Sequence, residues 1–337
     1  MIQDSPLQNN TTWLRLVALW VLAESFLGGL LHGLKLPVTG LLVGGSAMIC
    51  IQLIAWHFPN RGSVLKAMML VMLMKFSLSP HSPFPAYLAV LFQGISGEFL
   101  LRGRRLFLLK CLVFGFLGMM ESALQRLLVL VFLSGTEIWE ALDVWISKVS
   151  SGLGPEKFSQ WLALAYLLIH ALAGLVIGIL GHKLASSKPS DFPHFQLDGA
   201  AIELPEKPRR KKNSIAGHLI CLIALAVWLL LESEIFQLPG KVFFFVPLLL
   251  RMVWLYGLLV YLLVPMLDGF FRKFLAAKAQ HYAGTLEEIR KLLPEMLSLL
   301  KQSRDYSKQY RLGFPGFLRL LIFNILYANE KHTHPDR

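Results

Sequence analysis

Residues 161–180 read WLALAYLLIHALAGLVIGIL, an apolar run without a single Asp, Glu, Lys or Arg. A helix that crosses the hydrocarbon core of a bilayer needs roughly 20 such residues. Backbone amides inside lipid must be paired within the chain, so a helix is the expected structure. Similar runs lie at 14–31, 41–56, 64–78, 87–101, 106–133, 215–231 and 242–267. We therefore predict an all-α polytopic membrane protein with about eight spans.

Composition and charge distribution agree with this class. The 337 residues are 55% hydrophobic and only 16% charged, which excludes an ordinary soluble globular domain. The net charge of +12 gathers in alternate loops, around Arg61, at 102–105, at 207–212 and at 272–278. The positive-inside rule places such loops in the cytoplasm. The pattern predicts a bacterial cytoplasmic (inner) membrane protein with both termini inside, and no nucleic-acid partner.

The chain divides into four parts. Residues 1–185 hold six spans, 186–214 form a basic cytoplasmic linker, 215–267 hold two more spans, and 268–337 form cytoplasmic amphipathic helices. The segment 134–160 alternates apolar and acidic residues at near-helical spacing. This segment is expected either to lie at the membrane interface or to cover a binding site.

Polar residues inside the spans are costly and usually face a cavity or a partner. Glu121 and Gln125 lie one helical turn apart and share a face. A mostly apolar pocket with a few convergent polar groups would orient a small solute, whereas the alternative is a set of structural ion pairs and hydrogen bonds. The predicted substrate-binding residues are Glu121, Gln125, Arg126, Gln93, His32, His81, His170 and Thr39. Glu24 and Glu98 are better suited to helix pairing or partner contacts.

Small residues favour close helix packing in lipid. The glycines expected to form such faces are Gly28, Gly29, Gly33, Gly94, Gly97, Gly174, Gly178 and Gly181. No motif for catalysis accompanies them: Walker A, HExxH and GxSxG patterns are absent, and the three cysteines form no CxxC pair. We expect no enzyme activity, no catalytic residues, no metal and no cofactor.

The first six spans carry a series of short Gly/Pro motifs. They are Gly28–Gly33, Leu36–Gly40, Gly44–Ala47, Phe58–Gly62, and Gln93-Gly94 with Glu98. This order resembles the substrate-binding S components of energy-coupling factor (ECF) vitamin transporters, over residues 10–185. The resemblance implies a six-helix bundle whose first span faces a transmembrane coupling protein, here through Ala18, Ala23 and Ser25. The family's Ala-x-x-x-Ala spacing is absent from this span.

The second half resembles part of a truncated T component, the ECF coupling subunit. The resemblance rests on Leu293-Pro294-Glu295, Ser303-Arg304-Asp305 and Gln309–Gly313, while the Ala-Arg-Gly of that family is absent. The chain is thus expected to bind a vitamin or vitamin precursor at the outer face. Separate ATPase subunits would supply the energy. Two alternatives remain: a membrane scaffold that recruits a cytoplasmic partner, and an ion-coupled secondary transporter.

Overall fold

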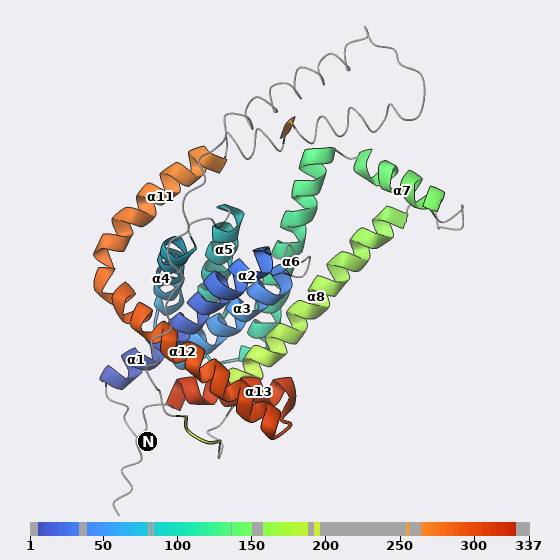
Figure 1. Ribbon diagram of the computed structural model, residues 1–337. Coiled ribbons are helices and arrows are strands. Elements are labelled where there is room, and N and C mark those ends of the chain that lie inside the picture. The colour runs from blue at the N-terminus through green and yellow to red at the C-terminus, as the bar shows by residue number, and fades with distance from the viewer. Residues whose placement is uncertain are drawn as a thin grey trace, which may run out of the picture. The chain divides into compact units, whose positions relative to one another are not determined.

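A computed structural model describes residues 6–33, 39–79, 82, 84–135, 137–149, 158–187, 192–195, 254–255 and 264–327 (Figure 1). These residues are almost entirely helical and contain no β-strand. The elements are α1 (Pro6–Leu22), the π-helical turn η1 (Ala23–Leu27), α2 (Gly28–Gly33), α3 (Thr39–His57), α4 (Ser63–Leu78), α5 (Phe84–Leu100), α6 (Phe107–Ser134), α7 (Glu137–Val149), α8 (Phe158–Ala185), α11 (Val264–His281), α12 (Ala283–Gln309) and α13 (Gly313–Tyr327).

Three of these helices are long and apolar enough to cross a bilayer. They cover Gly40–His57, Phe107–Phe132 and Phe158–Ala185. The prediction of a helical membrane protein is confirmed at this level. Helices also occupy the runs at 14–31, 64–78 and 87–101, but the count of six spans in this part of the chain stays a prediction. The runs at 215–231 and 242–267 lie outside the described residues, apart from Trp254, Leu255 and the start of α11.

The chain forms two compact units. The first contains Met1–Met119, Leu172–Glu206 and Leu275–Arg337, and the second contains Met120–Ala171 and Lys207–Phe274. In the first unit, α1 packs against α3 and α4, and α5 packs against α3 and α4. The core contains fully buried Leu16, Trp20, Ile51, Leu70 and Leu73. This packing buries apolar faces from four separate helices around one centre.

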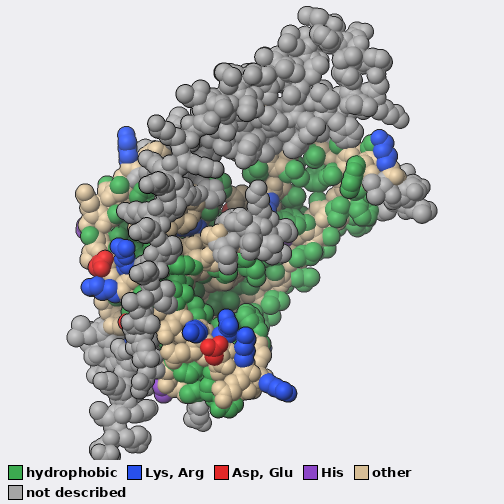
Figure 2. All heavy atoms as spheres, viewed as in Figure 1, with side chains coloured by type: hydrophobic (Ala, Val, Ile, Leu, Met, Phe, Trp, Pro, Cys, Tyr) green, Lys and Arg blue, Asp and Glu red, His purple; other side chains and the backbone are tan. Residues whose placement is uncertain are grey.

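Helix α5 shows how the bundle meets lipid. Its exposed apolar side chains are Leu88, Phe92, Ile95 and Phe99, which recur every three or four residues along one face. On the other face, Tyr87 and Val90 are buried. A large exposed apolar stripe on a helix of this kind is expected where the solvent is hydrocarbon. Hydrophobic side chains also cover much of the visible surface of α8 (Figure 2).

Glycines allow α6 and α8 to approach at backbone distance. A Cβ atom added at Gly178 would lie 2.6 Å from the carbonyl oxygen of Cys111, and one added at Gly174 would meet the backbone of Gly115. Added Cβ atoms at Gly94 and Gly97 on α5 would likewise meet Met68 on α4 and Ile51 on α3. The predicted close-approach faces are confirmed at these positions. Gly29 differs, because no described heavy atom lies within 4 Å of its added Cβ.

The C-terminal helices α12 and α13 pack on α1. Figure 1 shows α12 beside α1 and α13, and both α12 and α13 contact α1. The face of α12 that is buried carries Ile289, Leu293, Met296 and Leu299, at the spacing of an amphipathic helix. Amphipathic character in this region was predicted from the sequence, and α12 has it.

The short segment 192–195, after α8, is hydrogen-bonded to α13. The Asn324 side chain is fully buried and accepts a hydrogen bond from the Phe195 N–H at 2.8 Å. Its amide nitrogen donates to the Pro193 carbonyl oxygen at 3.2 Å. The start of the linker is therefore held by the C-terminal helices rather than extending freely from α8.

In the second unit, α7 occupies the segment where an interfacial helix or a cover was predicted. Asp143 on α7 accepts a hydrogen bond from the Ser159 N–H in the first turn of α8, at 2.7 Å. A carboxylate at a helix N-terminus pairs an orphan N–H and meets the positive end of the helix dipole. Trp145 on the same helix is 60% exposed, as a residue at headgroup level would be.

Candidate functional site

The most distinctive polar feature of the first unit is a buried ion pair. The Lys75 Nζ donates to Glu24 Oε2 at 2.6 Å, and each side chain is only 4% exposed. The two residues lie 51 positions apart, on α4 and η1. Removing both charges from water is expensive, and the cost is recovered only when the pair is close and well aligned. Charged groups placed inside a membrane bundle usually mark a solute or ion pathway.

The pair lies at a break in the first helix. Glu24 belongs to the π-helical turn η1, which joins α1 to α2 and contacts α3 and α4. A π-turn inserts an extra residue per turn and shifts the side chains that follow, and such turns are frequent at functional sites. Here the turn places the Glu24 carboxylate inside the bundle, within reach of Lys75 on α4.

Tyr87 on α5 contacts the pair, and two buried polar side chains lie near Glu24 in sequence. The Lys75 ammonium lies 5.8 Å from the centre of the Tyr87 ring, at the first turns of α5. Trp20 Nε1, four residues before Glu24, and Ser25 Oγ, directly after it, are buried without a hydrogen-bond partner among the described residues. Buried polar atoms of this kind normally pair with protein, water or ligand. The Glu24–Lys75 cluster thus combines a fixed charge pair with hydrogen-bonding capacity that the described protein atoms do not use.

The cluster lies near the end of α4, and a group of exposed basic residues lies near its start. We call the meeting point of the α3–α4 and α5–α6 connections the basic end, since Arg61, Arg102, Arg104 and Arg105 are exposed there. The Arg104 guanidinium stacks 5.1 Å from the centre of the Trp56 ring. Helix α4 begins at this end, and Lys75 lies in its last turn. The ion pair is therefore far from the basic end along α4.

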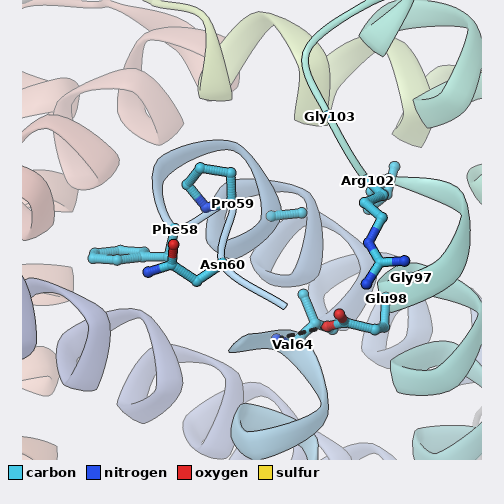
Figure 3. A pocket seen from close by; sticks show the side chains of 10 residues that line it. Phe58, Pro59, Asn60, Val64, Gly97, Glu98, Arg102 and Gly103 are labelled. Carbon is cyan, nitrogen blue, oxygen red and sulfur yellow. Dashed lines mark hydrogen bonds between the residues drawn. The ribbon is translucent and has the colours of Figure 1, made fainter. Parts of the chain in front are cut away.

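At the basic end, the Glu98 side chain on α5 connects that helix to the start of α4 (Figure 3). The Glu98 carboxylate accepts hydrogen bonds from the Gly62 N–H at 2.7 Å and the Val64 N–H at 3.2 Å, in the first turn of α4. The Gly62 φ of +82° is a conformation that glycine adopts without strain. The expected role of Glu98 in helix pairing agrees with this contact. The adjoining pocket has a volume of about 20 Å³, room for about one water and too little for a vitamin.

Replacing Glu98 tests this connection. Glu98→Leu is expected to lower the free energy of unfolding by about 1–2 kcal/mol, because two N–H groups at the start of α4 lose their acceptor. Glu98→Gln keeps one side-chain oxygen and should cost less. Unfolding of the purified protein by SDS in mixed micelles measures both. Equal midpoints for the Leu variant and the wild type would contradict the proposed cap.

The predicted substrate-binding residues are distributed over both units. Gln93 is buried in the first unit near α3, where its Nε2 lies 3.2 Å from the position of a Cβ on Gly44. Glu121, Gln125, Arg126 and His170 belong to the second unit. Glu121 is half-buried, and its Oε2 has no hydrogen-bond partner among the described residues. His170 Nδ1 lies 2.9 Å from the Tyr166 carbonyl oxygen, one turn back on its own helix.

The remaining predicted residues are described less completely. His32 lies in α2 and Thr39 begins α3, but their side chains lie outside the described part, as does all of His81. Of the residues expected to face a partner, Ala18 is fully buried and Ser25 is 8% exposed. Ala23, between them in sequence, is half-buried in η1. In the described ranges, no group of three or more His, Cys, Asp or Glu residues is arranged to hold a metal ion.

From the sequence, Glu24 was expected to serve in helix pairing or partner contacts, but no partner was identified for it. Lys75 lies in the apolar run at 64–78. Glu24 lies in a π-turn that contacts α4, and nothing in the local sequence marks that turn. One sequence signal could have linked them: an acidic residue in one apolar run and a basic residue in another, since charges inside a membrane usually face a partner.

Comparisons with known proteins supply no further guide to this site, since no family model, curated protein or solved structure matches the chain. The likeness to S components therefore depends on the short motifs of the sequence alone. The function must be argued from the cluster and the packing around it.

Proposed function

We propose that this chain is the membrane subunit of an uptake system for a small solute, such as a vitamin or vitamin precursor. It would lie in the bacterial cytoplasmic membrane with both termini inside. Solute would enter from the outer face, and separate ATPase subunits would supply energy through a transmembrane coupling protein. The observation that carries the proposal is the buried Glu24–Lys75 pair at the end opposite the basic end.

The position of the pair supports entry from outside. If the basic end faces the cytoplasm, as the positive-inside rule requires, the pair lies in the outer part of the bundle. It is then close in sequence to the outer connections 34–38 and 79–85, and the predicted residues His32, Thr39 and His81 lie in or beside these connections. A solute that carries a charged or strongly polar group could exchange hydrogen bonds with the pair and with Trp20 and Ser25.

The packing of α12 on α1 supports a coupling role for the second half. In the resemblance, the first span is the face that meets the coupling protein, and in this chain α12 lies against that span. A solute-dependent change at η1 would reach α12 through one continuous helix, α1. This arrangement favours transmission to the cytoplasmic helices over a passive anchoring role for them.

Ligand retention tests the proposal. The protein is purified from its own host in mild detergent, and native mass spectrometry is used to detect bound small molecules. We expect a co-purified solute on the wild type, reduced at least tenfold on the double variant Glu24→Gln with Lys75→Met. Lys66→Met, an exposed position on the same helix, is the matched control and should retain the solute.

Other outcomes point to the alternatives. Solute that stays on the double variant but leaves Glu121→Ala would move the site to the second unit. If the purified wild type carries neither a solute nor ATPase subunits, the result would favour the membrane scaffold. Uptake into proteoliposomes that needs a proton or sodium gradient, and no ATP, would favour a secondary transporter.

A further inference from the structure

A groove lies where α12 ends and α13 begins, in the first unit. Its volume is about 530 Å³, enough for a headgroup and the start of an acyl chain rather than a single water. The residues that line it are Arg304, Ser307, Lys308, Arg311, Gly313, Phe314 and Phe317. It is separate from the Glu24–Lys75 cluster and from the pocket beside Glu98.

The polar rim of this groove is cationic. Arg304, Lys308 and Arg311 are exposed, and all three line it. Among the described residues, Asp305 approaches the Arg304 Nε at 3.7 Å, with both side chains more than half exposed. An exposed pair at this distance contributes little and leaves the guanidinium available to another anion. The rim therefore favours a negatively charged group.

The rest of the surface is aromatic. Phe314 is 66% exposed and its ring centre lies 6.2 Å from that of Phe317. Just before the turn, Tyr310 is 55% exposed and its ring centre lies 4.3 Å from that of Tyr306. Exposed Phe side chains beside cations suit an amphipathic ligand, since the rings contact its apolar part while the cations bind its anionic part.

The groove is built into the fold rather than formed by mobile side chains alone. The Leu312 N–H donates to the Ser307 carbonyl oxygen at 3.0 Å, and the Ser307 hydroxyl donates to the Gly313 carbonyl oxygen at 3.3 Å. Arg311 and Gly313 adopt φ values of +50° and +66°, which reverse the chain between the helices. This turn carries Arg311, Gly313 and Phe314, all of which line the groove.

We propose that this groove binds the phosphate headgroup of an anionic phospholipid. The rim cations would bind the phosphate, and Phe314 and Phe317 would contact the glycerol and the first acyl carbons. Helix α13 is short and apolar, and it packs on α1 at the N-terminal part of the helix bundle. In a membrane protein, anionic lipid is present next to such a helix at high local concentration. A soluble acidic protein would match the cations but not the apolar floor.

Lipid rebinding tests the groove directly. The full-length protein is delipidated in detergent and titrated with phosphatidylglycerol or phosphatidylcholine, with bound lipid counted by native mass spectrometry. We expect phosphatidylglycerol to bind more tightly. The triple variant Arg304→Gln, Lys308→Gln, Arg311→Gln should lose roughly 10- to 100-fold of that affinity. Phe314→Ser should weaken binding of both lipids.

A second triple variant controls for net charge. Lys278→Gln, Arg290→Gln and Lys291→Gln remove the same number of exposed cations away from the groove and should leave lipid affinity unchanged. Equal losses in both triple variants would overturn the proposal, because they would show a general charge effect. So would unchanged binding in the first triple variant. Competition by inorganic phosphate or ATP at the same concentration as the lipid would assign the groove to a soluble phosphate compound instead.

Discussion

Lys75→Met is expected to lower the free energy of unfolding by about 3–5 kcal/mol, the cost of leaving a buried charge without its partner. The Glu24 carboxylate is 4% exposed and its hydrogen bond to Lys75 is 2.6 Å long, so water cannot replace the ammonium without opening the bundle. Methionine fills a similar volume, which separates the loss of charge from the loss of packing. SDS titration in mixed micelles measures the change.

The double variant of Glu24 and Lys75 distinguishes a structural role of the ion pair from a role in solute binding. Glu24→Gln with Lys75→Met removes both charges together and should regain most of the stability lost by the single change, since a buried pair adds little over well-packed neutral groups. Lys66→Met, whose ammonium lies 5.3 Å from the Trp13 ring centre at an exposed position, should cost about 1 kcal/mol or less. A stable double variant that has lost its solute would assign the pair to binding. A double variant as unstable as Lys75→Met would show that the coupling is not between these two charges.

Hydropathy predicted where the helices lie because it depends only on neighbours in sequence. The run at 161–180 falls inside α8, and the run at 106–133 falls within α6 except for its first residue, Leu106. Hydropathy could not show the break at Ala23–Leu27, because a π-turn differs from the α-helix around it in hydrogen-bond pattern and not in mean hydropathy. The glycine faces were predictable for a related reason, since only glycine removes the Cβ that would collide with Cys111 or Gly115.

The candidate site was less predictable because it depends on contacts between distant segments. Glu121 and Gln125 share a face of α6, but position on a face does not fix which helix lies opposite. Gln93 was expected to line a pocket with them, and the structure shows its side chain beside Gly44 on α3. Conversely, Glu24 and Lys75 meet across 51 residues, a pairing that hydrophobic periodicity does not encode.

The α6–α8 contact should be the part of the bundle most sensitive to an added methyl group. Gly178→Ala places a Cβ 2.6 Å from the Cys111 carbonyl oxygen and 2.9 Å from the Leu112 Cα, so the backbones must separate. Overpacking of this kind costs about 1–3 kcal/mol at one position. Gly174→Ala together with Gly178→Ala should therefore lose about 3 kcal/mol or more, because both would press on the same stretch of α6.

Gly29→Ala is the matched control for these changes. It adds the same methyl group in a helix where no described heavy atom lies within 4 Å, so it should be neutral or slightly stabilising through the lower entropy of the unfolded chain. The measurement is the fraction of each variant that remains monodisperse by size exclusion after heating, together with SDS titration. If Gly178→Ala behaves like Gly29→Ala, then α6 and α8 do not pack at backbone distance. If the double variant alone fails, the two glycines share the contact and the helices can adjust to one methyl group but not to two.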